Sequence, residues 1–234
     1  TFAPSNTNLG AVYTPSAAER IAGTVTLTLS TVGNGSCNAV GDAVTFTITP
    51  SPTVNAGVDR TVCANNVAVT LSGSSTVATG GMWSGGNGTF DPSTTNMSAI
   101  YTASAAEIAN GSVTLTLTTT GIGNCVAVTD QMTINFTAAP VVNAGAPVSL
   151  CANNAQVSLS GSVTGATGGV WSGGTGTYSP NNSTLTATYT PTAGEIAGGT
   201  LTLTLTSTGN GTCNPVQSSR VINFTPAPSV NAGP

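Results

Sequence analysis

Apolar residues alternate with threonine in the most regular stretch of this chain. From Val113 to Thr118 the sequence reads Val-Thr-Leu-Thr-Leu-Thr. Strict alternation predicts a half-buried β-strand, with apolar side chains facing a core and threonines facing solvent. Residues 25–30 and 201–206 have the same pattern, displaced by 88 positions in either direction. The alternation therefore predicts three copies of one strand.

The period of 88 residues runs through the whole chain. The tetrapeptide Val-Asn-Ala-Gly begins at Val54, Val142 and Val230. A fixed period of this length indicates tandem domains of one kind. It predicts the back part of a truncated repeat at residues 1–50, complete repeats at 54–139 and 142–227, and the start of another at 228–234. Proline at each boundary predicts short, semi-rigid linkers between the repeats.

Each complete repeat contains about seven short apolar segments separated by glycine- and asparagine-rich turns, at intervals of about 8–12 residues. This predicts an all-β fold of tandem immunoglobulin-like β-sandwich repeats. Trp83 and Trp171 occupy equivalent positions, and we expect both in the core between two sheets; an exposed platform for a ligand is the alternative. Tyrosines also recur at one position and are expected to be structural: Tyr13, Tyr101 and Tyr189.

One helical signal interrupts the strands in each repeat. Ser104 is followed three residues later by Glu107, as in a capping box, where the serine caps the helix and the glutamate reaches back to the cap. A short helical turn is therefore predicted before the main strand. Capping roles are expected for the three equivalent glutamates, with a catalytic or metal-binding role as the alternative: Glu19, Glu107 and Glu195.

Charged residues are scarce, at 4% of the chain, and histidine is absent. Neutralising nucleic-acid phosphates needs clustered lysine and arginine, which this chain does not have. A Ser-His-Asp set is impossible without histidine, and the scattered acids favour neither paired carboxylates nor a calcium site. We therefore expect no enzyme, cofactor or metal ion. No apolar run reaches the length of about 18 residues that suggests a membrane-spanning helix. Arg220 replaces the Met132 of the preceding repeat, which predicts a position at a strand end.

Five cysteines occupy two positions of the repeat. Cys63 and Cys151 share the first position, whereas Cys37, Cys125 and Cys213 share the second. Without histidine or a C-x₂-C motif, zinc is disfavoured, and disulfides in an exported protein are expected. Because the number is odd, at least one cysteine has its partner outside the chain.

Two disulfide pairings are open. The first lies within each repeat, as Cys63–Cys125 and Cys151–Cys213. Strand geometry disfavours it, because strands of about eight residues would place Cys63 and Cys125 at domain ends roughly 25 Å apart, whereas a disulfide needs a Cα separation of about 4.4–6.8 Å. The second pairing, Cys63–Cys213, joins the far end of one repeat to the near end of the next. Cys37, Cys125 and Cys151 would then pair outside the chain.

The repeat unit resembles those of the giant gliding-motility adhesins of gliding bacteria, and more broadly the polycystic-kidney-disease-type and Ig-like repeats of bacterial surface proteins. The resemblance rests on Val-Asn-Ala-Gly, Val-Cys-Ala-Asn-Asn, Trp-Ser-Gly-Gly, Ser-Ala-Ala-Glu-Ile-Ala and the Val-Thr-Leu-Thr-Leu-Thr strand, and covers the whole chain. It implies export by the type 9 secretion route, attachment at the cell surface, and movement over the cell by a motor. It implies no catalytic residues.

Three functions fit these features. The first is a structural stalk or filament segment of a secreted bacterial cell-surface adhesin, whose partners are neighbouring repeats of the same chain and an extracellular surface or glycan. The second is a glycan-binding module of a secreted protein, which would require exposed aromatic residues. The third is a self-assembling surface sheath, in which the outward threonines such as Thr114, Thr116 and Thr118 make lateral contacts.

Overall fold

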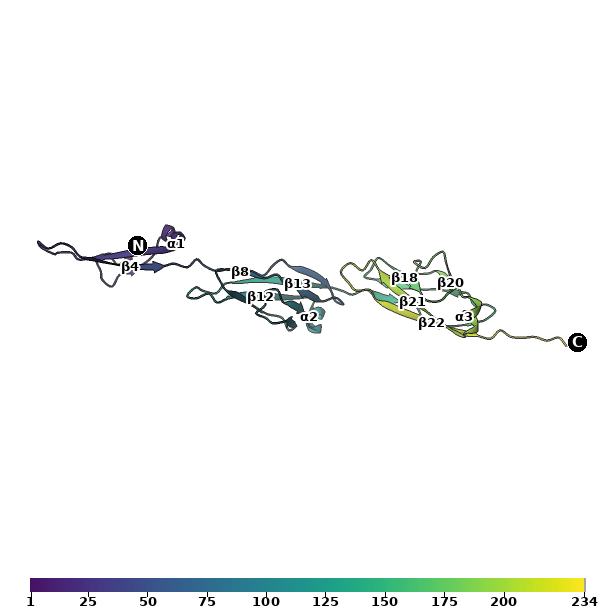
Figure 1. Ribbon diagram of the computed structural model, residues 1–234. Helices are drawn as coiled ribbons and strands as arrows, with labels where there is room; N and C mark the ends of the chain where they lie inside the picture. The colour runs from purple at the N-terminus through teal and green to yellow at the C-terminus, as the bar shows by residue number, and fades with distance from the viewer. Residues whose placement is uncertain (234) are drawn as a thin grey trace.

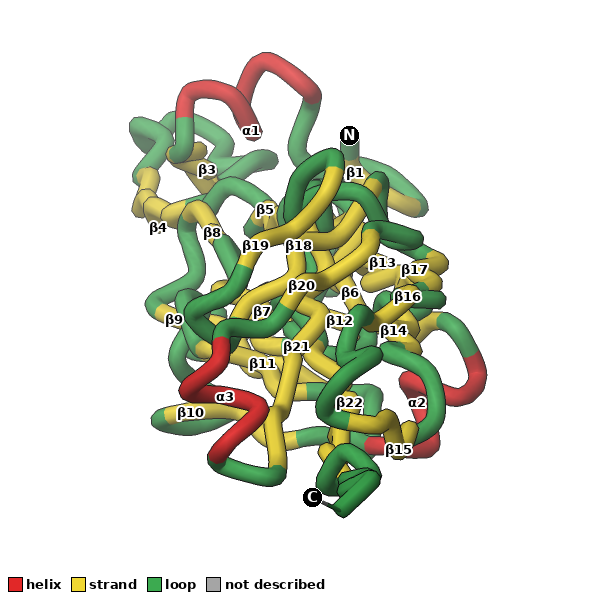
Figure 2. Tube along the Cα trace, turned by 90° about the vertical axis from the view of Figure 1, so that its right-hand side faces the viewer, coloured by secondary structure: helices red, strands yellow, loops and turns green. Residues whose placement is uncertain are grey.

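The computed structural model describes residues 1–233. Three β-rich units lie one after another along a line, with the unit of residues 1–50 at one end and the C-terminus at the other (Figure 1). Viewed along this direction, the units overlap one behind another (Figure 2). The chain is therefore an extended series of domains.

The first complete domain has two main sheets that enclose one core. A four-stranded sheet has the order β6 (Arg60–Cys63), β13 (Thr129–Thr137), β12 (Ser112–Thr120) and β9 (Gly80–Ser84). A three-stranded sheet has the order β10 (Thr89–Asp91), β11 (Ile100–Thr102) and β7 (Ala68–Thr70). Two further strands pair with each other, β5 (Thr53–Asn55) and β8 (Ser74–Thr76). The predicted all-β, immunoglobulin-like sandwich is confirmed, with short strands more numerous than the seven expected.

The second complete domain repeats this topology. Its four-stranded sheet has the order β15 (Val148–Cys151), β22 (Gln217–Thr225), β21 (Thr200–Thr208) and β18 (Gly168–Ser172). Its three-stranded sheet has the order β16 (Val157–Ser158), β20 (Thr188–Thr190) and β19 (Thr177–Ser179), and the extra pair is β14 (Val141–Asn143) with β17 (Ser162–Thr164). In both large sheets the edge strand that comes first in the chain runs parallel to the neighbouring strand that comes last in the chain. These parallel pairs are β6 with β13 and β15 with β22.

Both tryptophans lie in the cores, with 1% of Trp83 and none of Trp171 exposed. Each indole Nε1 donates a hydrogen bond of 3.2 Å to a backbone carbonyl, of Met97 and of Leu185 respectively. Buried indoles with a satisfied N–H are typical of a sandwich core. An exposed tryptophan platform for a ligand is therefore ruled out.

Each unit has one short helix, which connects a strand of one sheet to the following strand of the other. The helices are α1 (Ala17–Ala22), α2 (Ala105–Asn110) and α3 (Ala193–Ala197). All three begin with a complete capping box, and α1 and α2 end at glycines in the left-handed conformation. α3 ends one residue earlier, at Gly198, and the left-handed glycine follows at Gly199. In residues 1–233 no helix is both long enough and apolar enough to cross a membrane.

The unit of residues 1–50 has only part of this sandwich. It pairs β1 (Phe2–Ala3) with β2 (Val12–Tyr13), and β3 (Thr24–Ser30) with β4 (Gly41–Thr47). The strands that would precede β1 in the repeat are not in the chain, so the apolar face of the β3–β4 hairpin is only partly covered: Val25 is buried, whereas Leu29 is 62% and Phe46 49% exposed.

Arg220 lies in the middle of β22, opposite Leu203 of β21, so its predicted place at a strand end is wrong. Its Nη1 donates a hydrogen bond of 3.0 Å to the carbonyl of Ser158. An arginine can occupy such a position because its long stem packs on apolar neighbours while the guanidinium reaches a polar partner.

Candidate functional site: the junction between the two complete domains

The parallel pairing of β6 with β13 brings a cysteine to the domain boundary. In this register Cys63 lies opposite Thr137, the last residue of β13. The chain then passes through Ala138, Ala139 and Pro140 into β14. Because the strands are parallel, the end of β6 and the exit of the chain lie at the same end of the domain. Cys63 therefore faces the next domain.

A tight turn follows Cys63 and is fixed to the end of β13. The backbone N–H of Asn66 donates to the carbonyl of Cys63 at 2.9 Å, and the N–H of Ala64 donates to the carbonyl of Thr137 at 2.8 Å. The hydroxyl of Thr137 donates to the carbonyl of Val62 at 3.3 Å. We call residues 63–66 the turn half of the junction.

The second domain contributes a loop at its near end, between β21 and β22. Ser207, only 2% exposed, holds the base of this loop: its N–H donates to the carbonyl of Val216, and its hydroxyl accepts from the N–H of Val216, both at 2.9 Å. Within the loop, the N–H of Cys213 donates to the carbonyl of Asn210 at 3.0 Å. We call residues 209–216 the loop half; both halves are rigidly attached to strand ends.

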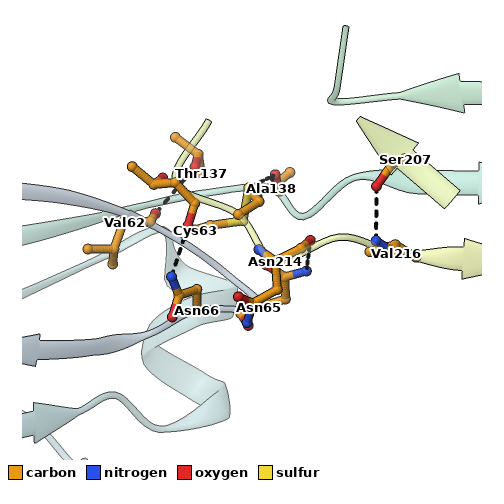
Figure 3. The surroundings of a disulfide bond; sticks show 11 residues. Val62, Cys63, Asn65, Asn66, Thr137, Ala138, Ser207, Asn214 and Val216 are labelled. Carbon is orange, nitrogen blue, oxygen red and sulfur yellow. Dashed lines mark hydrogen bonds between the residues drawn. A yellow bond between two sulfur atoms is a disulfide. The ribbon is translucent and has the colours of Figure 1, made fainter. Parts of the chain in front are cut away.

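Cys63 and Cys213 form a disulfide across the junction, with their Cα atoms 4.9 Å apart. We call this bond the staple. Each sulfur lies 3.9 Å from the carbonyl oxygen of Ala138 in the linker, a packing contact because a disulfide sulfur has no hydrogen to donate. Figure 3 shows the turn half, the linker and the loop half around the bond. The linker and the staple are thus two covalent connections between the domains.

The alternative pairs within each repeat, Cys63–Cys125 and Cys151–Cys213, do not form, because Cys63 and Cys213 bind each other. Cys37, Cys125 and Cys151 are free thiols. The geometric reason is the one that disfavoured these pairs. The two cysteine positions lie at opposite ends of a domain, since one is the last residue of the parallel edge strand and the other lies in the loop after the central strand.

Two asparagines of the turn half recognise the backbone of the loop half. The side-chain amide of Asn65 donates to the carbonyl of Asn214 and accepts from its N–H, both at 3.0 Å. The carbonyl of Asn65 also accepts from the side chain of Asn214 at 2.7 Å, and the side chain of Asn66 donates to the carbonyl of Thr212 at 3.0 Å. The sequence predicted only a turn at these asparagines; their recurrence as Asn153 and Asn154 was the available signal.

The equivalent tyrosines and glutamates meet in each unit. In the first complete domain the Glu107 carboxylate accepts four hydrogen bonds: from the Tyr101 hydroxyl at 2.6 Å, the Asn87 N–H at 2.7 Å, and the N–H and hydroxyl of Ser104 at 2.7 and 2.8 Å. Tyr13 pairs with Glu19 at 2.7 Å, and Tyr189 with Glu195 at 2.8 Å. The sequence predicted the helix cap but not the tyrosine.

This carboxylate is fully satisfied and lies in the interior, where 5% of Glu107 is exposed. Burial raises its pKa, but the hydrogen bonds from Tyr101, Ser104 and Asn87 outweigh burial and hold the pKa of Glu107 below its usual value. Burial, with the bond to Glu107, raises the pKa of Tyr101 to about 12. Neither group titrates near neutral pH. Within residues 1–233, no cluster of three or more potential metal-binding His, Cys, Asp or Glu residues occurs.

The second glycine after each Trp-Ser makes room for this network, whereas a Cβ on the first would meet a backbone carbonyl of the neighbouring strand. Gly86 has a positive φ of 74°, and a Cβ there would collide with the Tyr101 hydroxyl and approach Glu107. Gly174 stands in the same relation to Tyr189 and Glu195. The two glycines of the Trp-Ser-Gly-Gly motif are therefore explained by close approach of the backbone, the first to a strand carbonyl and the second to the buried tyrosine.

No family model matches the chain, and no curated protein matches it. Similar solved structures include extracellular cadherin domains 1–5 of protocadherin gamma B2, with 15% identity, 90% of this chain and 47% of that chain covered, and a TM-score of 0.37. Mouse cadherin-23 EC22-24 has 14% identity, coverage of 93% and 78%, and a TM-score of 0.39. A chimeric titin Z1Z2 has 13% identity, coverage of 76% and 98%, and a TM-score of 0.32. The chain spans about half the length of the protocadherin structure.

Proposed function

We propose that this chain is a segment of the stalk of a bacterial cell-surface adhesin of the gliding-motility type, exported by the type 9 route. The observation that carries the proposal is the staple, which joins two domains end to end in addition to their linker. A disulfide at a domain boundary does not complete a catalytic or ligand site. It restricts bending and separation of neighbouring domains, which is what a stalk requires.

The staple also changes how the chain transmits tension. A pull on the two chain ends follows the shortest covalent path, which runs through Cys63 and Cys213. The two cysteines are 150 positions apart, so the 149 residues between them lie outside that path. Most of both complete domains therefore carries no tension, and their unfolding would not lengthen the stalk.

The remaining path passes through two strands that are already extended. The tension enters through β6 and leaves through β22, and each of these strands is paired in parallel with another strand of its own sheet. Both strands are already extended, so the tension passes along their backbones and through the disulfide without loading the partner strands, which lie in the bypassed segment. The strand arrangement therefore supports a role under tension.

A self-assembling sheath is the second candidate, because the outer face of the large sheet is lined with hydroxyl groups. Thr114 of β12 and Thr133 of β13 lie opposite each other there, with their hydroxyl oxygens 3.3 Å apart. Analytical ultracentrifugation of the chain distinguishes the two candidates. An isolated stalk stays monomeric as its concentration rises, whereas a sheath associates. The buried tryptophans remove the main support for a glycan-binding module.

Surface display tests the proposal directly. Antibodies raised against the 234-residue chain should label intact cells of the source organism, and bound label should move along cells that glide. Labelling that appears only after the cells are permeabilised would contradict export. Labelling that stays fixed on gliding cells would contradict the gliding-motility role while leaving a surface stalk in place.

A further inference from the structure

We propose that the staple recurs at every junction of the repeat array, so that Cys125 and Cys151 are each half of a further disulfide to a neighbouring repeat of the same kind. This inference rests on the proposed function, since it requires an array. Each disulfide would then span a stretch of chain that overlaps the stretch spanned by the next one. The stalk would contain two continuous covalent paths, neither of which passes through residues 64–124 or their equivalents in other repeats.

The end of the second domain already has a complete turn half. The N–H of Asn154 donates to the carbonyl of Cys151 at 2.8 Å, as Asn66 does to Cys63. The N–H of Ala152 donates to the carbonyl of Thr225 at 2.8 Å, and the hydroxyl of Thr225 donates to the carbonyl of Leu150 at 3.2 Å. These are the three bonds that fix the turn half at Cys63. The thiol of Cys151 lies 3.8 Å from the carbonyl oxygen of Pro226, as the staple does from Ala138.

The beginning of the first domain likewise has a complete loop half. Thr119 replaces Ser207 and makes the same pair of bonds with Val128, both at 3.0 Å. The N–H of Cys125 donates to the carbonyl of Ile122 at 3.1 Å. The thiol of Cys125 lies 3.8 Å from the carbonyl oxygen of Pro50. Both free cysteines therefore sit in the surroundings that hold the two sulfurs of the staple.

A hollow beside Cys125 marks the place of the missing turn half. It is lined by Val77, by the loop from Gly121 to Cys125, and by Thr47 to Thr49, where β4 ends, as β13 ends beside Cys63. At the stapled junction the sulfur of Cys63 lies between the loop half and the linker, in contact with Ala138. The hollow thus lies where a turn half of a preceding repeat would enter.

Recognition between the halves tolerates sequence change in the loop. Three of the four cross-junction hydrogen bonds use backbone atoms of the loop half, at Asn214 and Thr212. Only the fourth uses a loop side chain, that of Asn214. Val126 stands at the equivalent position in the first domain, so that loop keeps its three backbone bonding positions and loses one side-chain donor. A turn half with two asparagines, such as Asn153 and Asn154, fits any such loop.

Each new bond is an ordinary thiol–disulfide exchange. Two cysteine thiols and one molecule of an external disulfide oxidant, such as oxidised glutathione, give one protein disulfide and two glutathione thiols. The protein is oxidised, the oxidant is reduced, and the two thiol protons pass to the departing thiolates. The step requires the oxidising conditions of an exported protein.

The topology that results has a mechanical consequence. Between Cys125 and Cys151 the chain runs for 26 positions through β13, the linker, β14 and β15, and Cys37 to Cys63 is the equivalent segment one repeat earlier. With a staple at every junction, each such segment is joined to the one two repeats away. Two covalent paths then run side by side, and neither passes through the body of a domain, residues 64–124 or its equivalents.

The test uses the full chain extended by one repeat, so that a copy of residues 142–229 follows residue 229. After oxidation with a mixture of reduced and oxidised glutathione, peptide mapping without reduction should show two disulfides. The Cys63–Cys213 bond remains, and Cys151 pairs with the copy's equivalent of Cys213. Free Cys151 in this folded protein, or its pairing with any other cysteine, would overturn the inference.

A matched pair of variants tests whether the asparagines direct the pairing. In the extended chain, Asn153→Ala should lower the equilibrium constant for closing the new disulfide against glutathione roughly tenfold, through loss of two hydrogen bonds, without affecting Cys63–Cys213. Asn65→Ala should do the reverse. Equal effects of both variants on both bonds would contradict local recognition. None of these outcomes depends on surface labelling, so this inference and the proposed function can fail separately.

Discussion

The unit of residues 1–50 and the first complete domain contain the same helix, hairpin and cysteine loop in different surroundings. Leu117 of β12 is completely buried, whereas its equivalent in β3, Leu29, is 62% exposed. The Glu107 carboxylate accepts four hydrogen bonds, but Glu19 accepts three, because the equivalent of Asn87 would precede residue 1. The helix, hairpin and loop therefore have the same local structure in both units, but their side chains are buried to different extents.

The difference shows what the front part of the repeat contributes. It supplies the equivalents of strands β5 to β9 with the core tryptophan, the backbone donor for the glutamate, and the turn half that staples the domain to the next one. The unit of residues 1–50 has a loop cysteine, Cys37, but no turn half of its own. One segment therefore both closes a domain and connects it to its neighbour.

The largest expected effect is on the length of the chain under tension. When the oxidised chain is pulled by its ends, residues 1–50 should unravel, whereas the 149 residues between the staple cysteines stay locked. Reduction should add roughly 500 Å of contour length, at about 3.4 Å per extended residue. Single-molecule force spectroscopy with and without reductant measures this difference directly.

Cysteine variants provide the controls for this measurement. Cys63→Ser should release the full length without reductant, whereas Cys37→Ser, which removes an exposed free thiol, should leave it locked. Equal contour lengths of the oxidised wild-type chain and the Cys63→Ser variant would show that the staple does not form in solution.

Much of this architecture could be predicted because the repeat is short and its signals are local. The alternation around Leu115 sets the strand, and the Ser104–Glu107 spacing sets the helix cap. Strand length alone disfavoured a bond between Cys63 and Cys125. Such features depend on residues close together in sequence, or on distances that a strand fixes.

Other features depend on which segments meet in space, and local patterns do not encode that. The hydrogen bond between Tyr101 and Glu107 joins β11 to the start of α2, and the contact of Asn65 with Asn214 joins residues 149 positions apart. Arg220 looked misplaced in a strand because its partner, the carbonyl of Ser158, lies in another sheet. In each case the residues could be named from the sequence, but the contact between the two partners could not.

Removing the buried Glu107 carboxylate should lower the stability of the first complete domain but not that of the second. Glu107→Gln replaces a charged acceptor of four hydrogen bonds by an amide, whose NH₂ group would face hydrogen-bond donors. The free energy of unfolding of the first domain should fall by about 2–3 kcal/mol. The first domain's melting temperature should fall by about 10–20 °C. Differential scanning calorimetry measures this, and the second domain, with its own Glu195, is the internal reference.

The matched control is Glu19→Gln, at the exposed equivalent. It should leave the transitions of both complete domains unchanged, because Glu19 contacts neither of them. If both substitutions lowered the melting temperature of the same transition by the same amount, the unit of residues 1–50 and the complete domains would unfold together. The expected difference in stability between them would then be absent.

A smaller effect is expected on acidification. Hydrogen bonds outweigh burial and lower the pKa of Glu107 and Glu195 in the folded domains relative to the ordinary value of 4.5. A carboxyl with a lowered folded-state pKa stabilises the fold fully above its unfolded pKa, and that contribution is lost as the pH falls through the folded-state value. The midpoint of urea unfolding should therefore fall between about pH 6 and pH 3. Glu107→Gln should flatten this dependence for the first domain.

The same titration tests whether the unit of residues 1–50 keeps its local structure when its core is uncovered. Hydrogen bonds from Tyr13 and Ser16 lower the pKa of Glu19 to about 2. This value requires both the helix cap and the pairing of β1 with β2, which places Tyr13. The Glu19 carboxyl resonance, followed by NMR, should therefore titrate near pH 2. A midpoint near the ordinary value would mean that the helix cap needs the front part of the repeat, and that burial and local structure form together.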